Sequence, residues 1–151
     1  VPVRAAAGGR RHRSGGALSA GSRRPLRFPW LWLGLGWLLV AGTVYFSLVP
    51  SPPTTDVVIN DKLLHFAIYG LLAGWFAGIY RRSRYPRIAI ALLALGAVIE
   101  LLQLAGGARM GEWLDFAANA AGIATGLGLA LIGLAGWCGW LERLVPGARH
   151  A

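Results

Sequence analysis

Charged residues and cysteine are both scarce in this chain of 151 residues. Asp, Glu, Lys and Arg make up only 14% of the sequence, whereas hydrophobic residues make up 56%. Soluble domains carry roughly 25% charged residues, so this composition argues against a soluble core. Cys138 is the only cysteine, which excludes an intrachain disulfide and a thiolate metal cluster. The composition therefore points to a membrane protein.

Long apolar runs confirm the membrane character of the sequence. A helix of about 20 apolar residues crosses the roughly 30 Å hydrocarbon core of a bilayer. Four runs approach or exceed this length: Trp30–Val49, Leu63–Tyr80, Ile88–Ala105 and Phe116–Trp140. We therefore predict an all-α, four-helix transmembrane bundle over residues 30–140. Residues 1–29, rich in Arg, Gly, Ala and Ser, are predicted to form a disordered cytoplasmic tail, and residues 141–151 a short second tail.

The basic residues are distributed unevenly between the connections. Thirteen of the fifteen lie before the first run, between the second and third, or after the fourth. Only Lys62 and Arg109 fall on the other side. The positive-inside rule then places both termini in the cytoplasm, as expected for a multi-pass protein of the bacterial inner membrane. The net charge of +9 follows the loops and not a folded face, so we expect no nucleic-acid partner.

Polar side chains gather at the outer ends of the predicted spans. An ionisable group near the bilayer centre costs roughly 2.5–3.5 kcal/mol on insertion scales, so such groups usually face a cavity, a partner or a substrate. Asp61, His65 and Tyr69 are four residues apart and share one helix face. Small residues at spacings of four, in the second and fourth runs, would let the helices approach closely. We therefore predict a ligand-binding pocket formed by Asp61, Lys62, His65, Tyr69, Glu100, Gln103, Arg109, Asp115 and Asn119.

Three interpretations of this pocket remain open at the sequence level. Lys62 and Arg109 could bind an anionic headgroup or a cell-wall precursor, with membrane lipid as the surrounding partner. Alternatively, His65 and Glu100 are candidate catalytic residues for acid–base chemistry on an envelope lipid. One His among several carboxylates is an incomplete metal signature, so no metal and no other cofactor is predicted. The third interpretation is a structural network that fixes the packing of the helices, with Asp61 and Asp115 as helix caps.

The order of these polar motifs resembles a known family. Asp61-Lys62-Leu63-Leu64-His65-Phe66 with Tyr69, Glu100-Leu101-Leu102-Gln103, and Arg109 followed by Asp115, Asn119 and Gly122 are similar to the motifs of the VanZ-like family. That family is named for an accessory protein of glycopeptide resistance that lowers susceptibility to teicoplanin. The resemblance runs from about Asp56 to Gly126. It implies a small integral membrane protein of the bacterial cell envelope, from a family linked to teicoplanin susceptibility, but it does not imply that this chain itself confers antibiotic resistance.

Overall fold

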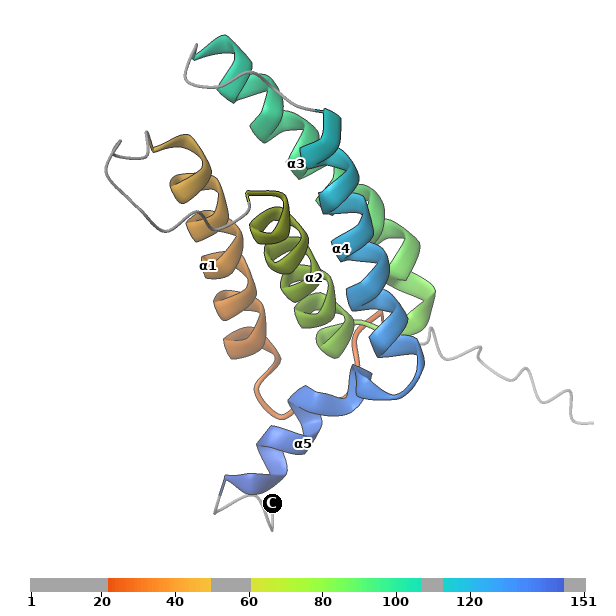
Figure 1. Cartoon of the computed structure of the whole chain (residues 1–151). Coiled ribbons are helices and arrows are strands. Elements are labelled where there is room, and N and C mark those ends of the chain that lie inside the picture. The colour runs from red at the N-terminus through yellow and green to blue at the C-terminus, as the bar shows by residue number, and fades with distance from the viewer. Residues whose placement is uncertain (1–21, 50–60, 107–112, 146–151) are drawn as a thin grey trace, which may run out of the picture.

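The computed structural model describes residues 22–49, 61–106 and 113–145. Its four long helices are α1 (Pro29–Leu48), α2 (Asp61–Ile79), α3 (Tyr85–Ala105) and α4 (Trp113–Leu131), and a short helix, α5 (Trp137–Leu144), follows (Figure 1). Single 3₁₀ turns, Arg82–Arg84 and Leu134–Gly136, precede α3 and α5. The four long helices are long and apolar enough to cross a membrane. The predicted all-α fold with four membrane-crossing helices is confirmed.

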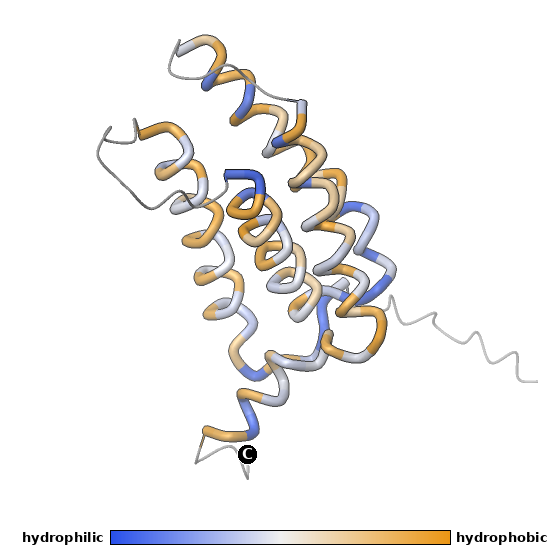
Figure 2. Tube along the Cα trace, viewed as in Figure 1, coloured by the Kyte–Doolittle hydropathy of each residue, from blue (hydrophilic) through white to orange (hydrophobic). Residues whose placement is uncertain are grey.

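Proline sets the starts of two of these helices. Pro29 is the first residue of α1, and Pro86 is the second residue of α3. Proline lacks the N–H that the first turn of a helix leaves unpaired, and its fixed φ suits that turn. Both helices then continue through largely apolar sequence, which Figure 2 shows as repeated orange segments along α1 and α3.

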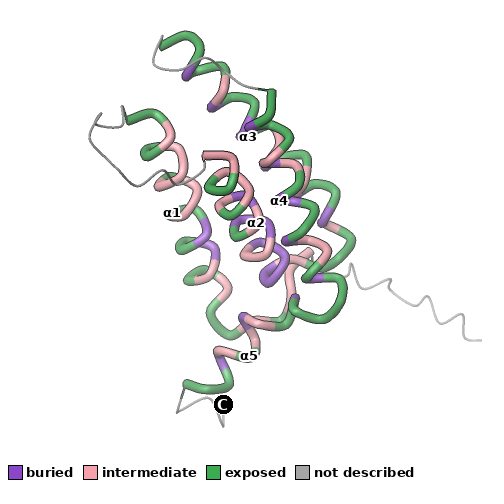
Figure 3. The backbone as a smooth tube through the Cα atoms, viewed as in Figure 1, coloured by how far each residue is buried: buried purple, intermediate pink, exposed green. Residues whose placement is uncertain are grey.

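Helix α2 lies between α1 and α4 and forms the centre of the bundle (Figures 1 and 3). Its closest partner is α4, because glycines bring the two backbones into contact. A Cβ atom on Gly122 would collide with the Phe66 carbonyl oxygen, and one on Gly126 would collide with the Gly70 carbonyl oxygen. The small-residue spacing seen in the sequence is therefore the α2–α4 interface.

The bundle has two chemically different ends. At the first, α2 and α4 begin and α1 and α3 end; we call it the cluster end because it carries the polar side chains described below. At the other, α1 and α3 begin, α2 and α4 end, and α5 follows; we call it the arginine end. Figure 2 shows hydrophilic residues at the start of α2 and again around the connection between α2 and α3.

The fourth span is shorter than the sequence predicts. The apolar run continues to Trp140, but α4 ends at Leu131 and α5 begins at Trp137. Gly133 lies between them with a φ of 130°, a backbone conformation that side chains other than glycine rarely adopt. The chain turns at this glycine, so a run of apolar residues that resembles one long span is two helices.

Residues 22–28, which we call the N-terminal strap, are ordered rather than part of a disordered tail. The Arg24 N–H donates to the Ile79 carbonyl at 2.8 Å, and the Arg81 N–H donates to the Ser22 carbonyl at 3.2 Å. The Arg24 side chain also donates to the Tyr80 carbonyl at 3.2 Å. The strap therefore supplies hydrogen bonds to the backbone where α2 ends. The rest of the predicted tail, residues 1–21, lies outside the described residues.

Glu142 of α5 attaches the strap to the start of α1. Its Oε2 atom accepts a hydrogen bond from the Arg27 N–H at 2.7 Å. Its Oε1 atom accepts bonds from the Phe28 N–H at 2.9 Å and from the Trp32 indole at 2.8 Å. Burial alone would raise the pKa of Glu142, but the backbone donors, the indole and the Arg27 charge outweigh it and lower the pKa below 4.5. The sequence alone predicts no role for this carboxylate, because it places the end of the fourth span at Trp140 and the start of a tail at residue 141.

Three tryptophans from separate helices pack together next to this contact. The ring centroids of Trp32, Trp75 and Trp137 are 4.9 to 5.8 Å apart in pairs. The Trp75 indole donates to the Trp32 carbonyl at 3.0 Å, and the Trp137 indole donates to the Gly74 carbonyl at 3.2 Å. Aromatic packing and satisfied N–H groups thus join α1, α2 and α5 at the arginine end.

Candidate functional site

Polar side chains of α2 and α4 meet at the cluster end. Five of them form what we call the polar cluster: Asp61, Lys62 and His65 from the first turns of α2, and Asp115 and Asn119 from the first turns of α4. The close glycine contacts one to three turns further along both helices hold the two polar faces together. The sequence predicts that these residues converge, and the structure brings them together.

An ion pair crosses the α2–α4 interface. The Lys62 Nζ atom lies 3.5 Å from the Asp115 Oδ1 atom. The Asp115 side chain is only 8% exposed, whereas that of Lys62 is 39% exposed. The Oδ1 atom accepts no hydrogen bond from the described residues, so its main compensation is the lysine charge. A buried carboxylate needs further hydrogen bonds to its remaining lone pairs, so a donor from an external polar group would stabilise Asp115.

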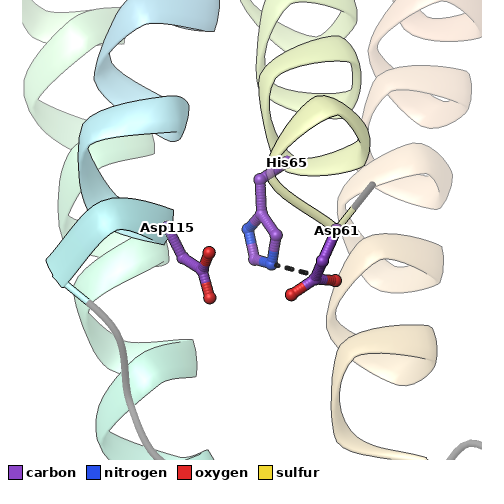
Figure 4. Close-up of side chains that lie close together, drawn as sticks. All are labelled: Asp61, His65 and Asp115. Carbon is purple, nitrogen blue, oxygen red and sulfur yellow. Dashed lines mark ion pairs between the residues drawn. The ribbon is translucent and has the colours of Figure 1, made fainter. Parts of the chain in front are cut away.

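His65 is oriented by Asn119. The His65 Nδ1 atom lies 3.1 Å from the Asn119 Oδ1 atom, and an amide oxygen only accepts hydrogen bonds. Nδ1 is therefore the donor, which leaves the lone pair of the neutral imidazole on Nε2. Nε2 lies 4.0 Å from the Asp61 Oδ1 atom, and a dashed line marks this pair in Figure 4. Because Asn119 is 1% exposed, this orientation is fixed from inside the bundle.

Asp61, His65 and Asp115 could together hold a cation. One ligand atom from each residue lies within 4.8 Å of the others, and the three side chains point toward one space in Figure 4. Imidazole with two carboxylates suits a divalent ion, and the Asn119 contact would fix the imidazole as a ligand. Lys62 already places a positive charge beside Asp115, however, and would be repelled by a metal ion. The geometry therefore favours an ion pair that recognises polar groups over a metal centre.

Asp115 is more than a helix cap. Helix α2 begins at Asp61 itself, and Asp115 is the third residue of α4. The Asp115 carboxylate faces Lys62 of the neighbouring helix. The structure thus shows interhelical pairing for Asp115, and the capping role of Asp61 stays a prediction.

The remaining predicted site residues divide into three groups. Tyr69 is 2% exposed, and its hydroxyl has no hydrogen-bond partner among the described residues, although Glu100 of α3 lies within electrostatic reach. Tyr69 lies one turn after His65 on α2, and its hydroxyl lies close to Gly96 of α3. Gln103 instead donates to the Ser47 carbonyl at 2.8 Å and ties α3 to α1. Arg109 lies outside the described residues.

A family model identifies the relatives of this chain. The model of the VanZ/LLP1 family matches residues 28–134. The chain belongs to the VanZ/LLP1 family. The matched region contains α1 to α4 and the whole polar cluster, and it ends before α5. No curated protein and no solved structure gives a significant match. The VanZ/LLP1 region thus includes the cluster end, whereas Glu142 and most of the strap lie beyond it.

Proposed function

We propose that this VanZ/LLP1 protein is a multi-pass protein of the bacterial inner membrane that recognises the polar part of an envelope lipid or cell-wall precursor. The observation that carries the proposal is the Lys62–Asp115 pair, 3.5 Å long, in which the acid is buried and the base is partly exposed. A phosphate or carboxylate can bind the exposed lysine, while hydroxyl or amide donors can reach Asp61 and the buried acid. Charged side chains in membrane helices cost insertion free energy, and a bound ligand would offset that cost.

The orientation of the bundle completes this proposal. With both termini in the cytoplasm, the cluster end faces the periplasm or the outer surface of the cell, as the distribution of basic residues indicates. Precursors of the cell wall are then within reach of Lys62. A link to glycopeptide susceptibility follows as part of the same proposal: a protein that binds such a precursor can change how teicoplanin reaches its target. Deleting the gene, or expressing it in a host that lacks it, should change teicoplanin susceptibility.

Mass spectrometry of lipids that co-purify with the protein tests the recognition directly. The protein would be extracted with its surrounding lipids into polymer nanodiscs, and enriched species would be compared with those of Lys62→Gln. We expect one class of anionic envelope lipid to be enriched on the parent and lost from the variant. Gln103→Leu is the matched control, because it removes an interhelical hydrogen bond without touching the polar cluster. Equal lipid content in the parent and Lys62→Gln would refute recognition by this residue.

An enzyme is the second candidate, and one observation favours it. The Asn119 contact leaves the Nε2 lone pair of His65 available as a general base, with Asp61 4.0 Å away to stabilise the imidazolium. In an enzyme, His65→Gln would lower the rate by about 10²–10⁴ while the ligand still binds. In a recognition protein, His65→Gln keeps a hydrogen-bonding group and changes binding little. A ligand that the parent converts and the His65→Gln variant only retains would replace recognition with catalysis.

A further inference from the structure

A groove runs along the outside of the bundle at the arginine end, far from the polar cluster. It is formed by α1, α2 and α3 and has a volume of about 330 Å³, at the lower end of the roughly 300–1,000 Å³ of small-molecule sites. Trp37 of α1, Phe76 of α2 and a stripe of α3 residues make its walls apolar. Arg84, the last residue of the 3₁₀ turn before α3, and Arg87 lie at one end of the groove, and the apolar stripe continues from them through Ile88, Ala91, Leu92 and Leu95.

The two arginines differ from the others around them. Five arginines of the strap and of the α2–α3 connection are engaged, either with backbone carbonyls (Arg24, Arg81, Arg82) or over aromatic rings (Arg23, Arg27). Within the described residues, the side chains of Arg84 and Arg87 make no hydrogen bond, ion pair or ring contact. Arg84 and Arg87, at the mouth of the groove, thus differ from the five neighbouring arginines, whose side chains contact the fold.

No carboxylate is available to neutralise them. Glu142 is the one acidic residue that the described chain places at this end, and the strap and Trp32 occupy both of its oxygens. Arg84 and Arg87 also flank the start of α3, whose first turn contains no acid. The N-terminus of a helix carries a partial positive charge, so cations there are unfavourable unless an anion joins them.

The length of the groove matches one leaflet of a bilayer. From Arg84 to Leu95 is eleven residues, which at 1.5 Å per residue spans about 16 Å along the helix axis. Half of a roughly 30 Å hydrocarbon core is about 15 Å. An acyl chain entering beside the arginines would therefore reach the level where the leaflet ends.

We propose that this groove is a binding site for one anionic phospholipid, with its phosphate on Arg84 and Arg87 and one acyl chain along the apolar stripe of α3. The site goes beyond the recognition proposed for the polar cluster, because it lies at the opposite end of the bundle and uses none of the cluster residues. Charge complementarity selects an anionic lipid over a zwitterionic one, and the apolar walls select a lipid over a free phosphate.

Native mass spectrometry of the detergent-purified full chain can test this site. The protein would be titrated with dioleoyl phosphatidylglycerol and, separately, with dioleoyl phosphatidylcholine. We expect one tightly retained phosphatidylglycerol and about a tenfold preference over phosphatidylcholine, since a charge-assisted contact contributes roughly that factor. Arg84→Gln/Arg87→Gln should abolish the preference. The control, Arg143→Gln/Arg149→Gln, removes the same net charge from the chain after the groove helices and should preserve it.

A second pair of variants tests whether lipid binding requires the apolar groove as well as the two arginine charges. Ala91→Trp fills the groove and keeps both arginines, so it should displace the retained lipid even if the double arginine variant fails to fold. Ala94→Trp adds the same bulk to an exposed position of α3 outside the groove and should leave lipid binding unchanged. Equal retention of the two lipids by the parent, or unchanged retention by Ala91→Trp, would overturn the proposal. Lys62→Gln should not affect this lipid, which keeps the result independent of the polar cluster.

Discussion

Adding one methyl group to Gly122 should separate α2 from α4. A Cβ atom at this position would collide with the Phe66 carbonyl oxygen and lie 3.0 Å from the Gly70 backbone nitrogen. Both neighbours are backbone atoms of α2, so no side-chain rotation can relieve the clash. Overpacking of a tight interface typically costs 1–3 kcal/mol, and we expect Gly122→Ala to lower the free energy of unfolding by about 2 kcal/mol.

Gly128→Ala is the matched control on the same helix. Nothing lies within 4 Å of the Cβ atom that this substitution would add. Alanine is favoured over glycine in a helix by about 1 kcal/mol, so this variant should be as stable as the parent or slightly more stable. The free energies of unfolding of both variants can be measured by titrating dodecyl sulfate into mixed micelles and following helical circular dichroism.

Gly122→Ala should also weaken the polar cluster. Gly122 lies three residues after Asn119, so any outward shift of α4 lengthens the His65–Asn119 contact of 3.1 Å and the Lys62–Asp115 contact of 3.5 Å. Lipid enrichment in nanodiscs should therefore fall in Gly122→Ala and stay unchanged in Gly128→Ala. If the two variants were equally stable and bound equal lipid, the close α2–α4 approach would not be what assembles the cluster.

Two further predictions concern the charge of Glu142 and the orientation of the bundle in the membrane. Glu142→Gln should lower the free energy of unfolding at pH 7. The hydrogen bonds and charge of Arg27 and its neighbours lower the pKa of Glu142 in the folded protein. The difference in unfolding free energy between the parent and the variant should therefore be complete above about pH 4.5 and vanish as the pH falls through the folded-state pKa. A difference that persisted unchanged at low pH would show that the charge of the carboxylate does not matter. For orientation, Ser83→Cys should be protected from an impermeant thiol reagent in intact cells and Gly106→Cys should be labelled; the opposite pattern would invert the topology. The native Cys138 should not interfere, because it is fully buried and burial and the nearby Glu142 raise its pKa to about 12.

The sequence predicts the positions of the first three helices well, for a simple physical reason. A span needs a continuous apolar run, and charged or proline-rich segments interrupt it, so hydropathy locates α1, α2 and α3 to within a few residues. The same signal fails after Leu131. Residues 132–141 remain largely apolar, and only the positive φ of Gly133 shows that the chain turns there. One glycine among 22 gives no such information in advance.

The composition of the site could be predicted, but its pairing could not. Spacing along one helix places Asp61 and His65 on a shared face, because that depends only on helical geometry. Which helix faces them depends on lateral packing, which the backbone contacts at Gly122 and Gly126 set. Gln103 illustrates the difference: it lies at the predicted level but turns to Ser47 of α1. Glu142 had one available signal: it is the one acidic residue on the side of the membrane where thirteen of the fifteen basic residues are predicted to lie.

Variants of the Lys62–Asp115 pair distinguish most sharply between a ligand-binding role and a purely structural role of this pair. Removing only the lysine leaves a buried carboxylate without compensation, so Lys62→Met should destabilise the protein. The cost should be about 1–3 kcal/mol, less than the roughly 3–5 kcal/mol of a fully buried pair, because solvent screens the 39% exposed lysine. The double variant Lys62→Met/Asp115→Leu removes both charges and should recover most of the loss, since apolar replacements of an ion pair are often neutral or stabilising.

Lipid binding by this double variant then decides between the two roles. If the pair exists to bind a ligand, the double variant should fold with nearly parental stability and fail to enrich the envelope lipid. If the pair only fixes the register of α2 and α4, the double variant should bind as the parent does whenever it is stable. A stable double variant with parental lipid enrichment would therefore remove Lys62 and Asp115 from the recognition site, and His65 with Asn119 would remain as the polar groups to test.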